Sequence, residues 1–175
     1  MTKVMIGDPS RFAIEYELDA AHMKDPEAAF WQFGCVRYWI GRESVGQLET
    51  ATLCTLVAES KSIASGRGKR VDRSLCAMGA DEVARFITRV LYEDYGQSDV
   101  EIAADSRQYS EFEVSPGIDV FVPWRIILID CDDAARVIWY RKREGPVREF
   151  QLRLGEYEDV VETFVSCLER KTAVT

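Results

Sequence analysis

The chain has 175 residues and a formal net charge of −8 at pH 7, and 47% of its residues are hydrophobic and 30% charged. These proportions are typical of a globular protein, so we expect a single domain spanning residues 1–175. The excess of carboxylates argues against binding to nucleic acids or to anionic membranes, whose phosphates attract cations, and it permits a basic protein partner.

The first third of the chain reads as strands. Short strands are predicted at 3–6 and 11–19, because apolar and acidic residues alternate in the second and Gly7-Asp8-Pro9 separates the two. Residues 20–28 contain Asp25-Pro26 and predict a loop.

Residues 30–41 then predict a central strand that carries large side chains on both faces. Because successive side chains of a strand point to opposite sides, both faces would be apolar and covered. One face would hold Phe30, Val36, Tyr38 and Ile40, and the other Trp31, Phe33, Cys35 and Trp39.

The middle of the chain predicts helices. After a short continuation of the strand at 43–48, apolar residues recur at helical spacing over 50–65 and, more clearly, over 81–95. A basic loop is expected at 66–79. The acidic stretch 97–117 reads as irregular, with a short strand near 110–114.

The last third predicts a long strand at 119–130, a hairpin partner at 135–142 and a strand at 148–154, in which Phe150, Leu152 and Leu154 would face inward. A final helix at 156–170 would bury Tyr157, Val160 or Val161, Phe164 and Leu168. Runs of strands followed by runs of helices predict an α+β fold, with a mostly antiparallel central sheet and about three helices.

Candidate catalytic and metal-binding groups are few. His22 is the single histidine, and no motif connects it to a nucleophile, so an exposed loop position is favoured over a catalytic base. Asp130, Asp132 and Asp133 could hold a divalent cation, but their spacing does not match a calcium loop and a polar turn is favoured. No metal and no cofactor are therefore expected.

Two further patterns have a functional and a structural interpretation. Gly66-Arg67-Gly68-Lys69-Arg70 lacks the glycine and hydroxyl positions of a phosphate-binding loop, so a solvated basic helix end is favoured. A group of four aromatic residues could stack on bases, but the negative net charge favours a role in the core. The four are Trp31, Phe33, Tyr38 and Trp39.

The cysteines predict free thiols. They are odd in number, widely spaced and without a Cys-x-x-Cys pair, which favours buried thiols in a reducing cytoplasm. They are Cys35, Cys54, Cys76, Cys131 and Cys167. The start of the chain does not resemble a signal peptide, and no apolar run approaches the ~18 residues of a membrane span.

The negative charge is concentrated in residues 99–135, where two arginines and nine carboxylates give 2 − 9 = −7. Such a segment either keeps the protein soluble or attracts a basic partner. For the second case, the predicted contact residues are Asp99, Glu101, Asp105, Glu111, Glu113, Asp132 and Asp133.

Residues 5–48 resemble the immunity protein 42 family of bacterial polymorphic toxin systems. The matching residues are Ile6-Gly7-Asp8-Pro9, Phe12-Ala13-Ile14, Trp31, Gly34, Tyr38-Trp39-Ile40, Gly41 and Gly46. The resemblance implies a cytoplasmic protein that binds and neutralises a cognate toxin without catalysis. The matching positions look like determinants of the fold, with glycines where the backbone bends or another segment approaches closely.

Two other functions stay open at this point. One is a small cytoplasmic enzyme with a carboxylate site near Asp130–Asp133, and the other is an adaptor or structural subunit whose partner is not a toxin. A toxin gene next to this one would favour the immunity protein, and a metabolic operon would favour the enzyme.

Overall fold

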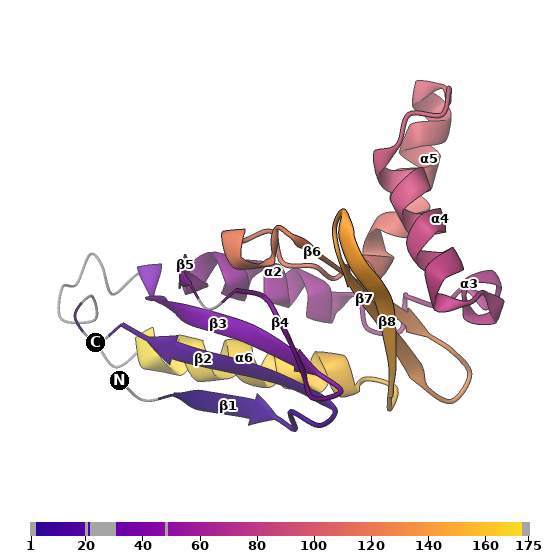
Figure 1. Cartoon of the computed structure of the whole chain (residues 1–175). Coiled ribbons are helices and arrows are strands. Elements are labelled where there is room, and N and C mark those ends of the chain that lie inside the picture. Colours follow the sequence, from indigo (N-terminus) through magenta and orange to yellow (C-terminus); the bar gives the residue numbers. More distant parts are fainter. Residues whose placement is uncertain (1–2, 20, 22–30, 48, 173–175) are drawn as a thin grey trace.

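The structure is a computed structural model that describes residues 3–19, 21, 31–47 and 49–172 (Figure 1). Its strands form two antiparallel sheets, one from the first third of the chain and one from the last third. The described residues also form five α-helices, so the predicted α+β class is confirmed and the predicted number of helices was too low.

The N-terminal sheet has the order β1-β2-β3-β4, and β5 also pairs with β3. The alternation of apolar and acidic residues that predicted β2 places Ile14 opposite Tyr38 of β3 on the inner face. The five strands are β1 (Val4–Gly7), β2 (Phe12–Leu18), β3 (Phe33–Ile40), β4 (Glu43–Val45) and β5 (Thr50–Thr52).

The expectation that β3 is covered on both faces was wrong. Its inner face is buried through Val36, Tyr38 and Ile40, whereas Trp39 on the outer face is only partly buried. Trp31 precedes the strand and is 49% exposed. Phe30 lies outside the described residues.

A charged group explains why the outer face is not a second core. Glu15 of β2 lies opposite Arg37 of β3, and its carboxylate accepts hydrogen bonds from Arg37 Nη2 and from Trp39 Nε1, both at 2.8 Å. Lys3 Nζ lies 2.9 Å from the same carboxylate. Burial by itself would raise the pKa of Glu15, but these hydrogen bonds outweigh burial and lower it.

The C-terminal sheet is the one covered on both sides. It has the order β6-β7-β8, with β6 (Trp124–Asp130), β7 (Ala135–Arg141) and β8 (Glu144–Leu152). Leu128 and Val137 pack into a core shared with the N-terminal sheet, whereas Ile127, Ile129 and Ile138 pack into a second core beneath α4. The sheet therefore separates the two cores.

Two strand limits differ from the prediction. Residues 119–121 form a short 3₁₀ helix, so the long strand starts only at Trp124. Leu154 follows the end of β8 and is 48% exposed, although the alternation had predicted it to face inward.

The helices divide into two groups, and Figure 1 shows α2 and α6 along the N-terminal sheet and α3, α4 and α5 beyond the C-terminal one. They are α2 (Leu53–Ser65), α3 (Arg73–Ala77), α4 (Ala80–Tyr92), α5 (Asp99–Tyr109) and α6 (Glu156–Thr172). The predicted inward residues of α6, from Tyr157 to Leu168, are buried. None of these described helices has both the length and the apolar character needed to cross a membrane.

The helix α5 was missed because none of its residues is buried, so it carries no apolar stripe. It has instead a capping box. The Glu101 carboxylate accepts the backbone N–H of Ser98 at 2.8 Å, and Ser98 Oγ accepts the N–H of Glu101. The predicted strand near 110–114 is a 3₁₀ helix, η2 (Ser110–Phe112), followed by a single bridge from Glu113 to Ile127.

Two of the glycines in the family resemblance have clear structural reasons. A Cβ at Gly34 would lie 2.2 Å from the carbonyl oxygen of Glu17 on the neighbouring strand. Gly41 has φ +57° in the turn after β3, and a Cβ there would meet the ring of Phe150 at 2.6 Å. The prediction that such glycines are determinants of the fold is confirmed.

An ion pair fixes the N-terminal sheet to the start of α6. Arg11 Nε and Nη2 donate to the two carboxylate oxygens of Glu156, at 2.6 and 2.7 Å. These bonds, with smaller contributions from Arg153, lower the pKa of Glu156 to about 2. Since the ionised form is the stabilised one, this contribution is complete above the ordinary pKa of 4.5 and is lost as the pH falls towards 2.

We expect Glu156→Gln to lower the free energy of unfolding by about 1–3 kcal/mol at pH 7, because it removes a charge-assisted pair. The difference from the original protein should shrink as the pH falls below 4.5. Urea unfolding across this pH range measures it. Glu162→Gln is the control, because Glu162 is exposed and lies 3.4 Å from its partner Arg67. A difference that does not change with pH would contradict this role.

Because β6 is covered on both faces, we expect that truncating either of two consecutive side chains destabilises the protein to a similar extent. Ile127→Ala and Leu128→Ala should each cost about 2–5 kcal/mol, because both side chains are fully buried but in different cores. Val122→Ala, at an exposed position, should stay within ~0.5 kcal/mol of the original protein. Thermal unfolding tests this, and a small cost at either Ile127 or Leu128 would mean that one face is open.

Candidate functional site

The carboxylates that suggested a metal or catalytic site do not form one. Asp130 is buried at the end of β6, and burial raises its pKa, whereas Asp132 and Asp133 are exposed in the turn that follows. Among the residues that the structure describes, no three metal-ligating side chains come together. His22 lies outside the described residues.

The basic loop after α2 is only partly solvated, and this corrects the prediction. Arg70 is buried, and its guanidinium donates to Glu158 Oε1 of α6 at 2.8 Å and to the carbonyl oxygens of Glu111 and Ile63. Arg67 is more exposed and pairs with Asp159 at 2.6 Å. The loop therefore uses its cations to join α2, η2 and α6.

The aromatic residues of 30–41 likewise do not form one platform. Tyr38 is fully buried between Phe12 and Phe121, Trp39 lies against Arg37 on the outer face, and Trp31 is exposed beyond the strand. Of the four residues Trp31, Phe33, Tyr38 and Trp39, only Tyr38 is fully buried and has the core role that was predicted for the group.

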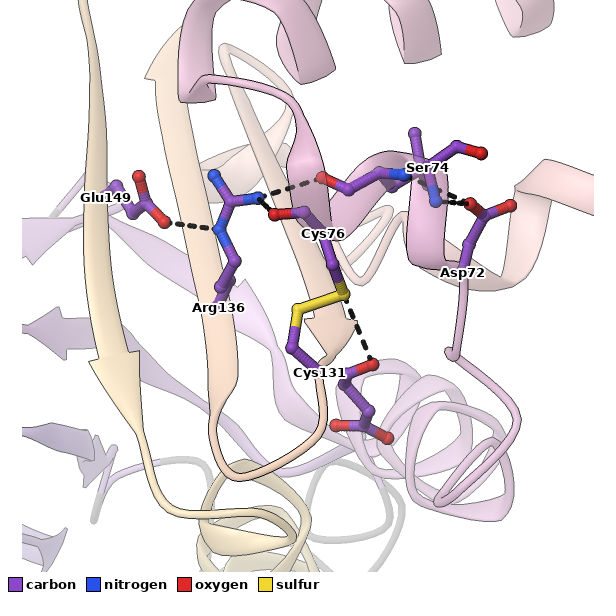
Figure 2. Close-up of a disulfide and its surroundings, with 8 residues drawn as sticks. Asp72, Ser74, Cys76, Cys131, Arg136 and Glu149 are labelled. Atoms are coloured by element: carbon purple, nitrogen blue, oxygen red, sulfur yellow. Dashed lines mark hydrogen bonds and ion pairs between the residues drawn. A yellow bond between two sulfur atoms is a disulfide. The ribbon is translucent and has the colours of Figure 1, made fainter.

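The prediction of free thiols was wrong for two of the five cysteines. Cys76 of α3 and Cys131 after β6 form a disulfide, with their Cα atoms 5.9 Å apart (Figure 2). They are 55 residues apart in the sequence, and the bridge between Val71 and Asp130 brings their segments together.

Figure 2 shows how α3 is held next to this disulfide. Asp72 accepts the backbone N–H groups of Ser74 and Leu75 at the start of the helix. At its end, Arg136 Nη1 donates to the carbonyl oxygens of Leu75 and Cys76, while Nε donates to Glu149. The segment that leads into α4 is therefore anchored firmly to the C-terminal sheet.

The helices α4 and α5, residues 80–109, form an arm that projects from this sheet (Figure 1). Val83 and Ile87 bury the base of the arm in the second core. Along α5 no residue is buried, and Val100 is 78% exposed and Ile102 47%. An exposed helix with apolar and acidic side chains is suited to contact another protein.

The predicted acidic residues separate into three places. Asp99, Glu101 and Asp105 lie on α5, and Glu111 follows on η2. Asp132 and Asp133 lie in the β6–β7 turn, well away from α5 in Figure 1.

The seventh predicted contact, Glu113, is occupied within the protein. Its carboxylate accepts Arg125 Nη1 at 2.6 and 2.7 Å, and the hydroxyl of Tyr92 at 2.5 Å. The Arg125 guanidinium also lies over the ring of Tyr92, 3.4 Å from its centroid. Glu113 thus holds the end of α4 against β6.

A feature that the sequence did not predict is a cleft of about 600 Å³ beside the arm. Exposed Arg85 and Arg89 line one wall together with Asp81 and Glu93, and Tyr140 and Val147 of the C-terminal sheet line the other. The sequence gives one sign of this cleft, namely that Arg85 and Arg89 are four residues apart and therefore lie on the same face of a helix.

The family model for immunity protein 42 matches residues 1–166. The chain belongs to this family. It is therefore an immunity protein, and the resemblance seen in residues 5–48 extends over almost the entire chain.

A solved structure supports the same fold. The immunity protein is similar to the crystal structure of CdiI from Burkholderia dolosa AUO158, with a TM-score of 0.73 and 18% sequence identity. The alignment covers 94% of this chain and 99% of that one. No curated protein matches the sequence.

The buried pair of Arg70 and Glu158 gives a stability prediction for this immunity protein. Arg70→Met should cost about 3–5 kcal/mol, because it leaves the Glu158 carboxylate buried without its cation. The double variant Arg70→Met with Glu158→Leu should recover at least half of that loss, since both charges are then gone. Chemical denaturation measures both. A double variant no more stable than Arg70→Met would show that the other hydrogen bonds of Arg70 dominate.

Proposed function

We propose that this immunity protein binds a cognate toxin in the bacterial cytoplasm and neutralises it by covering part of its surface, without catalysing a reaction. The observation that carries the proposal is the family match over residues 1–166. The two cores share one sheet, which supports action as a single domain.

We propose further that the toxin contacts the acidic side of the arm. Asp99, Glu101 and Asp105 lie on a helix without buried residues, close to the exposed side chains of Val100 and Ile102. Glu111 extends this surface towards the base of the arm, whereas Asp132 and Asp133 would form a separate contact. Because the surface is acidic, the matching region of the toxin would be basic.

Two of these acidic groups already make hydrogen bonds that prepare them for contact. The bonds from Ser98 lower the pKa of Glu101, so its carboxylate remains ionised. Asp105 accepts the hydroxyl of Tyr95 at 2.9 Å. Both side chains are held in place along α5, which reduces the entropy lost on binding.

The test uses the toxin encoded by the gene next to this one and measures association rates. The variant Asp99→Asn, Glu101→Gln, Asp105→Asn removes three charges but keeps hydrogen-bond acceptors, including that of the capping box. Association should slow by about three- to tenfold at ~0.05 M salt, and the difference should largely vanish near ~1 M, where charges are screened.

The matched control is Glu49→Gln, Asp119→Asn, Glu162→Gln, which removes the same charge from exposed positions outside α5 and outside the predicted contacts. Equal slowing by both variants would show that only net charge matters. A larger effect of the control would contradict a contact on α5. Absence of any complex between the original protein and the toxin would refute the proposed function itself.

A further inference from the structure

The disulfide between Cys76 and Cys131 closes a covalent ring that contains the arm. The two cysteines are 55 residues apart, and the chain between them includes α4, α5 and β6. Cys76 lies on α3, directly before the arm, and Cys131 directly follows β6. The bond therefore restrains the arm at its base when it is formed and releases that restraint when it is broken.

A disulfide is an unusual feature in the compartment proposed for this protein. Cytoplasmic thiols are kept reduced, and the disulfides that do form there are usually transient bonds that respond to redox conditions. All five cysteines belong to the described residues, and the other three, Cys35, Cys54 and Cys167, form no disulfide. The chain thus joins only the pair at the base of the arm.

Both bonded cysteines are open to attack by a small dithiol while the protein is folded. Disulfide exchange requires an attacking thiolate to reach one of the two sulfurs. Cys76 and Cys131 are each partly exposed, and Cys131 is followed by the exposed turn residues Asp132 and Asp133. Reduction of the bond therefore does not require the protein to unfold.

Noncovalent contacts keep the two segments together when the bond is open. Leu75 of α3 is fully buried, and Arg136 donates to the carbonyl oxygens of Leu75 and Cys76 at 2.9 and 3.1 Å. The Cys76 sulfur lies 3.7 Å from the carbonyl oxygen of Asp130, which can accept a hydrogen bond from the thiol that reduction forms. The two sulfurs thus stay close enough to be joined again.

The arm is the part of the molecule that this bond affects most. Its base is held by Val83 and Ile87 of α4, whereas α5 buries no residue. Opening the disulfide removes the covalent restraint on the segment before α4. We therefore expect larger fluctuations of α3 and α4 in the reduced protein and, through α4, of α5.

We propose that Cys76 and Cys131 form a reversible redox link that sets how firmly the arm is held for toxin binding. The inference rests on the proposed function and adds a regulation to it. The reductant is a cytoplasmic dithiol protein, and the oxidant is oxidised glutathione. The link is open in the reducing cytoplasm and closes when the cell is oxidised.

Both directions of the step are thiol–disulfide exchange. The thiolate of the dithiol attacks one sulfur of the link, a mixed disulfide forms, and the other cysteine leaves as a thiolate. The second thiol of the reductant then resolves the mixed disulfide. Two electrons and two protons have passed to the immunity protein, which holds two thiols, and the dithiol has become a disulfide. Oxidised glutathione reverses the step and leaves as two glutathione thiols.

The first test examines the link without the toxin. Dithiothreitol added to the folded protein should increase the free thiols from the three unbonded cysteines to all five, and oxidised glutathione should reverse this. Amide hydrogen exchange in α3 and α4 should accelerate at least about threefold on reduction, whereas α6, which lies outside the ring, should not change. A bond that opens only in denaturant, or unchanged exchange, would overturn the inference.

The second test measures binding to the toxin encoded by the neighbouring gene. Reduction of the original protein should raise the dissociation constant about two- to fivefold, because the toxin must then restrict a looser arm. Cys76→Ser with Cys131→Ser should bind like the reduced protein with and without dithiothreitol, and this variant also reveals any effect of the reductant on the toxin itself. The matched control is Cys35→Ser with Cys54→Ser, which keeps the link and should respond to reduction as the original protein does.

The outcomes separate this inference from the proposed function. Equal binding of the toxin by the oxidised and the reduced protein would overturn only the inference. A control variant that no longer responds to reduction would assign the response to the free thiols, and this too would overturn it. If the original protein binds no toxin in either redox state, the proposed function has failed, and the thiol count and hydrogen exchange still decide whether the link exists.

Discussion

The buried side chain of Arg70 is the contact on which the arrangement of the whole molecule depends. It donates to α6 through Glu158 and to the carbonyl groups that end α2 and follow α5, and its own carbonyl accepts the backbone N–H of Asp130. The helices of the N-terminal sheet are thereby connected to β6 and to the base of the arm. The geometry is demanding, because Glu158 Oε2 and Asp130 Oδ1 have no hydrogen-bond partner among the residues that the structure describes, and burial raises the pKa of both carboxyls. Such a site tolerates few alternative arrangements of the surrounding segments.

The C-terminal sheet, which Arg70 connects to the N-terminal helices, supports the exposed helix α5. One face of β6 and β7 closes the main core, and the other face holds α4 through Val83 and Ile87. The disulfide and Arg136 hold α3 at the entrance to the arm. Because these contacts fix α4, the neighbouring α5 remains in place without burying a residue of its own. Most of its surface is thus available for a partner, although Tyr109 at its end packs against Phe86 of α4.

The charged side chains also divide into a set inside the fold and a set at the surface. Inside the fold, carboxylates are matched by arginines, as in the pairs of Glu15 with Arg37 and Glu113 with Arg125. The charges at the surface are arranged differently, because α5 carries Asp99, Glu101 and Asp105, whereas carboxylates and arginines both line the cleft.

The sequence by itself determined the α+β class, the inward face of β2, the buried face of α6 and the family. Those features depend on local periodicity and on glycines such as Gly34 and Gly41, whose backbone requirements are visible in a short segment. Only the tertiary structure decided which sheet is covered twice, because β3 and β6 are both apolar and the difference arises from Glu15 on the neighbouring strand. It also decided that Cys76 meets Cys131, that Glu113 is bound by Arg125, and that Arg85 shares a cleft with Tyr140 and Val147. Each of these depends on residues brought together from distant parts of the chain, and no local pattern carries that information.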